Sequence, residues 1–317
     1  MNKTGYFTHS DCRKHDMGRG HPECPERLDA IEDRLLISGV GDALDRREAP
    51  LAPLADLELA HGRMHVASLR GLSDGLKEEL LAGGPEHVQI DPDTCMNSST
   101  WEASLRSAGA ALAATDAVMA GELENAFCAT RPPGHHACRD KAMGFCFFNN
   151  VAVAAKYALE RHGLKRVAIV DFDVHHGNGT EDIVAGDERI LMVSFFQHPL
   201  YPFGGADSTA SNLVNVPVPA YTKGMAVREL IDLYWMPRLE AHRPEMIFIS
   251  AGFDAHREDD LGQMGLVEQD YAWITDRIKD VARRHSSKRI VSCLEGGYAL
   301  SALARSVEAH IRVLADV

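Results

Sequence analysis

A run of ionisable residues directly after an apolar, β-branched segment constrains this chain most. The segment Arg166–Val170 (RVAIV) is predicted to form a buried strand, and Asp171–Asn178 (DFDVHHGN) follows it at once. Because side chains alternate along a strand, Asp171, Asp173 and His175 are expected on one side. Carboxylate oxygen and imidazole nitrogen are ligands that zinc accepts at catalytic sites. The alternative is a salt-bridged loop with two structural histidines.

Apolar, β-branched segments alternate with amphipathic, Ala- and Leu-rich segments along much of the chain. The predicted strands are Ala126–Thr130, Arg166–Val170, Arg189–Phe195, Met246–Ala251 and Arg289–Leu294, and the predicted helices are Ser98–Ala120, Asn149–His162, Gly224–Glu240, Glu268–Arg284 and Leu300–Ala315. This alternation predicts an α/β fold with a mostly parallel central sheet and helices on both faces. We find no repeat, low-complexity tract or flexible linker, so residues 1–317 are expected to form a single domain.

Composition limits the classes of function. The 317 residues are 45% hydrophobic and 25% charged, which is typical of a soluble globular protein, and no apolar run is long enough to cross a membrane. We see no signal peptide, and the seven cysteines contain no C-x-x-C pair, so a cytoplasmic protein with reduced thiols is expected. The net charge of −13 argues against nucleic acid as a partner. It is compatible with cationic substrates, although acidic surfaces also simply keep proteins soluble.

Three further predicted strands are also followed by polar residues. They lead into Arg131–His136 (RPPGHH), into a segment that carries Asp254, and into Glu295–Tyr298 (EGGY). The carboxyl ends of parallel strands lie at one edge of a sheet, where ligands bind in open α/β folds. We therefore expect these acids, imidazoles and the phenol to converge with the first cluster.

The converging residue types suit metal-assisted hydrolysis. Asp173, His175 and Asp254 supply three ligands and leave a position open for water and substrate. A neutral histidine, His135 or His136, would move the proton from water to the leaving amine.

Two further residues complete this set. Asp171 would orient one of the two imidazoles, and Tyr298 would donate its hydroxyl to the oxyanion. Alone, the Glu-Gly-Gly-Tyr segment would instead suggest a capping aromatic residue.

In their order along nearly the whole chain, these motifs resemble those of the zinc-dependent histone deacetylases and their bacterial relatives. The opening His21–Leu28 (HPECPERL) and Asn178 are similar to class II members and bacterial amidohydrolases. The other matching segments are Arg131–Ala137, Gly144–Asn150 (GFCFFNN), Asp171–Thr180, Ser250–His256 and Glu295–Tyr298.

The resemblance implies a role for each matching residue. It implies one Zn²⁺ held by Asp173, His175 and Asp254, with His136 as general base and acid. His135 would be the electrostatic partner of His136, with Asp171 behind it, and Tyr298 would be the oxyanion donor. A narrow acyl-lysine tunnel is implied at Gly144, Phe145, Tyr201, Leu261 and Gly296.

The resemblance also implies structural K⁺. A first site would use the carbonyls of Asp171, Asp173, His175 and Phe195 with the side chains of Asp171 and Ser194. A second site would involve Val184, Asp187, Ile190 and Asn212.

The expected substrate is an acetyl-lysine peptide or a small acetylated amine such as an acetylpolyamine. Leu261 stands where a polyamine-selective branch carries a gatekeeper Glu, yet bacterial acetylpolyamine amidohydrolases lack that Glu too. The acidic run Glu258–Asp260 would either face the mouth or form a solvated turn. The loops Asp11–Pro25 and Phe196–Asn212 are expected to shape the mouth, and a homo-oligomer, in which a partner's loop narrows it, stays open.

Two other functions compete with this hypothesis. An arginase-like ureohydrolase shares the architecture but needs two metals bridged by further Asp and His ligands, whereas Ser250–His256 offers one Asp where such a site needs a pair. A catalytically inactive acyl-lysine binding module would be expected to have lost a zinc ligand, a His or Tyr298, and all are present.

Overall fold

The computed structural model describes residues 3–317 and is built around one eight-stranded sheet. The strand order is β2-β1-β5-β10-β9-β6-β7-β8, and every neighbouring pair is parallel. A separate antiparallel hairpin is formed by β3 and β4. The strands are β1 (Thr4–Thr8), β2 (Leu44–Glu48), β3 (His87–Asp91), β4 (Thr94–Asn97), β5 (Asn125–Cys128), β6 (Val167–Asp171), β7 (Ile190–Gln197), β8 (Leu213–Val218), β9 (Met246–Ala251) and β10 (Ile290–Leu294).

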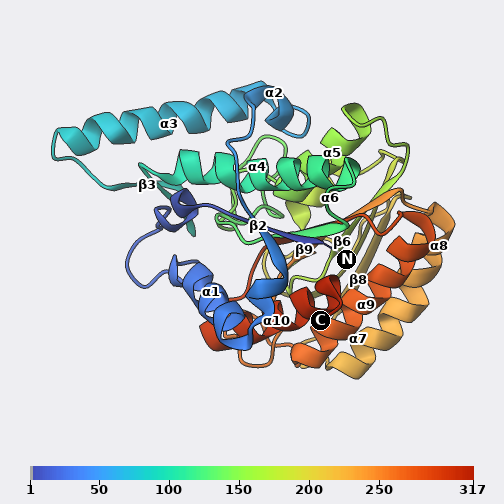
Figure 1. The fold of residues 1–317 in the computed structure, drawn as a ribbon. Coiled ribbons are helices and arrows are strands. Elements are labelled where there is room, and N and C mark those ends of the chain that lie inside the picture. Colours follow the sequence, from blue (N-terminus) through green and yellow to red (C-terminus); the bar gives the residue numbers. More distant parts are fainter. Residues whose placement is uncertain (1–2) are drawn as a thin grey trace.

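Helices cover both faces of the sheet, as the alternation of elements predicts (Figure 1). One face carries α2, α3, α4 and α5, and the other carries α1, α7, α8, α9 and α10 (Figure 1). The helices are α1 (Glu26–Ser38), α2 (Leu54–Leu57), α3 (Arg63–Leu81), α4 (Thr100–Met119), α5 (Asn150–Glu160), α6 (Asn178–Val184), α7 (Gly224–Leu230), α8 (Met236–His242), α9 (Glu268–His285) and α10 (Leu300–Ala315). None of the helices within residues 3–317 is long and apolar enough to span a membrane.

The five predicted strands correspond to β5, β6, β7, β9 and β10, and every residue in them is buried. In strands covered by helices on both faces, apolar and polar residues do not alternate, and the strand is a continuous apolar run. Such runs are what predicted these five strands from the sequence. Pattern reasoning missed β2, because this edge strand has the sequence LDRRE and is half-exposed. Charged residues are common on edge strands, where they discourage pairing with another chain.

The predicted helix Gly224–Glu240 is corrected by the structure. It is divided into α7 and α8 by a π-helical turn at Ile231–Trp235. Pro237 lies in the first turn of α8. Its nitrogen has no hydrogen to donate, so a continuous α-helical hydrogen-bond ladder cannot pass through this point.

Four strands in the middle of the sheet position the functional residues. In the order β5-β10-β9-β6 they are direct neighbours. Their carboxyl ends lead into Arg131–His136, Glu295–Tyr298, the Asp254 loop and Asp171–Asn178, respectively. The predicted convergence is therefore a consequence of strand order.

Candidate active site

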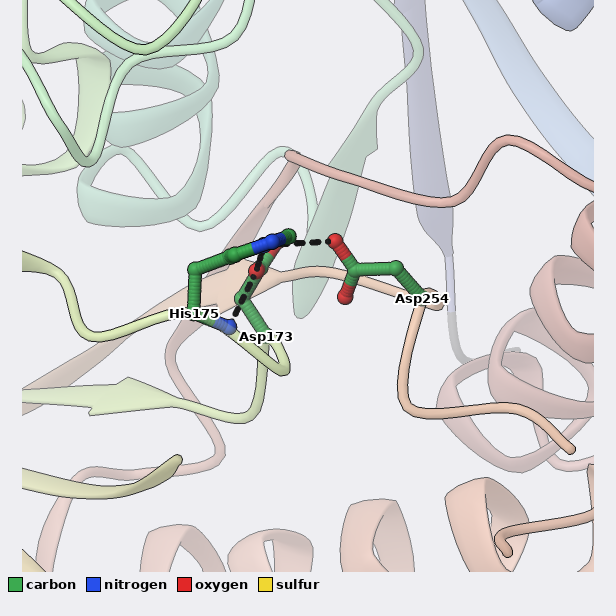
Figure 2. Close-up of side chains that lie close together, drawn as sticks. All are labelled: Asp173, His175 and Asp254. Carbon is green, nitrogen blue, oxygen red and sulfur yellow. Dashed lines mark hydrogen bonds and ion pairs between the residues drawn. The ribbon is translucent and has the colours of Figure 1, made fainter. Parts of the chain in front are cut away.

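Asp173, His175 and Asp254 form a compact three-residue group (Figure 2). The first two follow β6 and the third follows β9, which pairs with β6. The Nδ1 atom of His175 lies 3.0 Å from Oδ1 of Asp173 and 3.1 Å from Oδ2 of Asp254. One potential ligand atom from each residue lies within 4.8 Å of the other two. The predicted ligand residues are thus brought together.

The group fits a small cation. Both carboxylates are fully buried. The backbone of Gly296 packs directly against them, so closely that a Cβ atom at this position would lie 2.0 Å from Oδ2 of Asp254. Burial disfavours a charged His175, yet its hydrogen bonds to the two carboxylates and their charges outweigh this and raise its pKa to about 10. The pocket therefore stabilises positive charge, and its oxygen and nitrogen donors suit zinc.

The two histidines after β5 have different partners. Nδ1 of His135 lies 3.0 Å from Oδ2 of Asp171, whereas Nδ1 of His136 lies 2.7 Å from Oδ1 of Asn178. Burial opposes protonation of His135, but the Asp173 and Asp171 carboxylates raise its pKa well above the usual value. Burial and the neighbouring His135 and His175 hold the pKa of His136 well below the usual value. The pair is thus divided into one imidazole that holds a proton and one that is free to accept it.

Buried ion pairs and hydrogen bonds fix the turn that carries these histidines. Oε2 of Glu295 accepts the backbone N–H groups of Gly134 at 2.7 Å and His135 at 3.0 Å. The Arg131 guanidinium donates to the buried Glu23 carboxylate.

Arg27 also donates to Glu23, and its Nε donates to the Gly297 carbonyl at 2.7 Å. Its guanidinium carbon lies 5.0 Å from the centre of the Tyr298 ring. Glu23 and Arg27 belong to the His21–Leu28 motif, to which sequence reasoning assigned no individual roles.

A cavity of about 210 Å³ leads to the metal-ligand group. Of the predicted tunnel residues, Gly144, Phe145, Tyr201 and Leu261 line it. The prediction for Gly296 is corrected: it does not line the cavity but packs against the ligand carboxylates, and its N–H donates to Asp173 at 2.9 Å. The full lining is Asp93, His136, Gly144, Phe145, His175, Leu200, Tyr201, Leu261 and Tyr298.

Sequence reasoning missed Asp93 and Leu200. Asp93 lies in the turn of the β3–β4 hairpin, outside the motifs that carry the family resemblance, so no spacing signal marked it. Leu200 lies beside Tyr201 in the loop Phe196–Asn212, which was expected to shape the mouth but has no regular pattern from which to select individual residues.

Comparison with known proteins places this chain in a family. The histone deacetylase domain matches residues 21–314. The chain belongs to the histone deacetylase family. It is 38% identical over 286 residues to the histone deacetylase-like amidohydrolase of Pseudomonas aeruginosa, which covers 88% of this chain and 73% of that protein. It is 35% identical over 305 residues to a probable deacetylase of Archaeoglobus fulgidus, covering 94% and 82%, respectively.

Solved structures agree with this assignment. The crystal structure of the HDA15 HD domain superposes with a TM-score of 0.90 at 31% sequence identity, covering 100% of this chain and 90% of that one. The single-domain fold with a central parallel sheet is therefore the histone deacetylase fold. The predicted resemblance and fold class are confirmed.

The two potassium sites suggested by the family resemblance differ in how well they fit. At the first, Asp171 and Ser194 are paired in the register of β6 and β7, and Phe195 follows directly. At the second, the Nδ2 atom of Asn212 itself donates to three carbonyls, those of Val184 (2.8 Å), Asp187 (3.3 Å) and Ile190 (2.9 Å). The Asn212 amide thus bonds to the carbonyls of the residues that were expected to hold the second ion.

The acidic run Glu258–Asp260 does not behave as a unit. Glu258 and Asp260 are exposed, and Glu258 pairs with Arg305. Asp259 is buried with 5% of its surface exposed. Asp259 therefore neither faces the mouth of the cavity nor belongs to a solvated turn.

Proposed function

We propose that this member of the histone deacetylase family is a zinc-dependent amide hydrolase that removes acetyl groups from Nε-acetyl-lysine or from acetylated small amines. One observation carries the proposal. A three-ligand group, a proton-accepting histidine and a tyrosine meet at one cavity, and the ligand His175 lies in its lining beside His136 and Tyr298.

Asp173, His175 and Asp254 would hold the ion, with Zn²⁺ favoured by their mixed oxygen and nitrogen donors and Fe²⁺ or Co²⁺ as alternatives. When bound, the metal supplies Lewis acidity, which polarises the amide carbonyl and lowers the pKa of the attacking water. Within residues 3–317 only one such group of potential ligands gathers. This favours a single-metal hydrolase over a two-metal, arginase-like enzyme.

His136 is the general base and acid in this proposal. Its lowered pKa keeps the ring neutral, so it can take a proton from water and pass it to the leaving amine. His135, paired with Asp171, contributes a positive charge beside it. Tyr298 donates its hydroxyl to the oxyanion.

The cavity favours a slim, flexible acyl chain. Phe145 and Tyr201 are aromatic residues in its lining, with Leu261 also contributing apolar surface. Each buried methylene of a lysine or polyamine would contribute about 0.8 kcal/mol. We further propose that K⁺ occupies the first site, at Asp171, Asp173, His175, Ser194 and Phe195, and that residues 1–317 act as one catalytic domain.

The test combines metal analysis with hydrolysis. Purified protein should contain about one equivalent of metal, and it should hydrolyse a fluorogenic acetyl-lysine amide, an acetylated polyamine, or both. Comparison of kcat/KM for the two identifies the preferred substrate class. Zinc-replete protein that cleaves neither would sink the proposal.

A variant pair tests the metal site directly. Asp254→Ala should lose both metal and activity but stay folded, because it removes a ligand. Asp260→Ala changes an exposed acid six residues away and should keep both. A fully active, zinc-replete Asp254→Ala enzyme would falsify the ligand assignment.

A further inference from the structure

Asp259 joins two loops of the active site through backbone hydrogen bonds. Its Oδ2 atom accepts the N–H groups of Tyr298 at 2.6 Å and Ala299 at 3.0 Å. Its Oδ1 atom accepts the N–H of Leu261 at 3.0 Å. Both carboxylate oxygens therefore accept hydrogen bonds, and all three donors are backbone N–H groups.

The two loops that Asp259 joins carry different parts of the cavity. The loop after β9 supplies the cavity residue Leu261 as well as the ligand residue Asp254, and the loop after β10 supplies the cavity residue Tyr298. Leu261 and Tyr298 both line the cavity. Asp259 itself is not among the lining residues, so it can affect a substrate only through the residues that it holds.

The loop after β10 needs such a support. Gly297 has a φ of 120°, a conformation that glycine adopts readily and that leaves the backbone next to Tyr298 with few intrinsic constraints. Tyr298 and Ala299 directly precede α10, and Ala299, as the N-cap, provides no side-chain hydrogen bond. Asp259 thus places a negatively charged acceptor at the amino-terminal end of that helix from another loop.

We propose that Asp259 is a positioning residue that sets the place of the Tyr298 phenol and of the Leu261 wall relative to each other. This inference rests on the proposed function, in which Tyr298 donates to the oxyanion. The Arg27 guanidinium supports the ring of Tyr298, while Asp259 holds the backbone from which that ring projects. A catalytic group displaced by about 1 Å costs up to about 100-fold in rate.

The informative substitution is Asp259→Asn. It keeps the shape of the side chain, but one carboxylate oxygen becomes an NH₂ group, which cannot accept a backbone N–H. At least one of the three hydrogen bonds is lost. We expect kcat to fall by about 10-fold or more with metal content unchanged, because no metal ligand is altered. Asp260→Asn and Glu258→Gln change exposed neighbours and serve as matched controls with wild-type kcat.

A double-mutant cycle separates positioning from general stabilisation. If Asp259 acts through the Tyr298 hydroxyl, Asp259→Asn should change kcat by less than about 3-fold in a Tyr298→Phe background, where that hydroxyl is absent. A purely structural residue would instead lower kcat by the same factor in both backgrounds. Should the Asn variant not fold, Asp259→Glu keeps both acceptors but displaces them, and it undergoes the same cycle.

The outcomes are distinct. Wild-type kcat in Asp259→Asn, or equal losses in the two backgrounds, overturns the role of Asp259. Failure of wild-type protein to cleave either acetylated substrate overturns the proposed function instead. A large loss in the wild-type background that nearly disappears in the Tyr298→Phe background supports the inference.

Discussion

The Nδ1 atom of His136 lies 2.7 Å from the side-chain oxygen of Asn178, a neutral acceptor. The adjacent His135 faces the Asp171 carboxylate at 3.0 Å. The two imidazole rings, whose centres are 4.0 Å apart, therefore have partners of different charge: a neutral amide for His136 and a carboxylate for His135. A neutral acceptor fixes the orientation of His136 without stabilising a positive charge as strongly as a carboxylate would.

Replacing this neutral acceptor by a carboxylate should shift the pH profile. In Asn178→Asp, a negative charge at hydrogen-bond distance should raise the pKa of His136. A base works deprotonated, so the acid limb of the kcat/KM profile should move to higher pH. The measurement is kcat/KM for an acetylated substrate across the pH range. Asn178→Ala adds no charge and should show no such upward shift, and a downward shift in Asn178→Asp would contradict the base assignment.

Removal of one phenol hydroxyl should have a large kinetic effect and little structural effect. Tyr298→Phe is expected to keep its fold and metal content, while kcat falls by about 100-fold or more, as for loss of a single oxyanion donor. Tyr221→Phe is the matched control, since Tyr221 is 75% exposed and does not line the cavity. A kcat for Tyr298→Phe within about 3-fold of the wild-type value would make Tyr298 a wall residue.

The Asn212 amide should matter for stability in a cation-dependent way. Asn212→Ala removes the donor shared by the carbonyls of Val184, Asp187 and Ile190 and should lower the free energy of unfolding by at least about 2 kcal/mol. Three carbonyls facing a vacated position can bind K⁺, so KCl should stabilise the variant more than NaCl at equal ionic strength. Denaturant unfolding of both proteins in the two salts checks this. An equal preference for KCl in wild type and variant would show that the amide does not replace a cation.

A buried histidine of α10, outside the cavity lining, should make stability depend on pH. His310 contacts the hydroxyls of Thr275 and Ser292 inside the core, and burial lowers its pKa to about 3. Below about pH 6.5 the unfolded chain takes up a proton at this position and the folded protein does not, so stability falls as the pH falls.

His310→Gln lacks this titration and provides the comparison. Between pH 7 and pH 5, wild type should lose about 2 kcal/mol of unfolding free energy relative to the variant. The measurement is urea unfolding of both proteins at the two pH values. A difference between the two proteins that does not change with pH would mean that His310 is protonated in the folded state as readily as in the unfolded one.

The parts of the site that could be predicted from the sequence are those that lie beside buried strands. β5, β6, β9 and β10 were recognisable because strands buried on both faces must be continuously apolar, and the polar residues after them then stand out. The parallel arrangement places those strand ends at one edge, so the grouping of Asp173, His175 and Asp254 followed from local patterns and strand direction.

Other features were decided only by the tertiary structure. Asp259 reaches the backbone of a residue 39 positions away, and Asp93 reaches the cavity from a hairpin outside the central sheet. The amide of Asn212 bonds to carbonyls 22 to 28 positions earlier in the chain. Backbone N–H and C=O groups are the same at every residue, so a sequence does not mark which of them a distant side chain will meet. Which backbone group a side chain meets depends on how the loops pack against one another in the folded protein. Hydrogen bonds from distant side chains to loop backbone are therefore seen only in the tertiary structure.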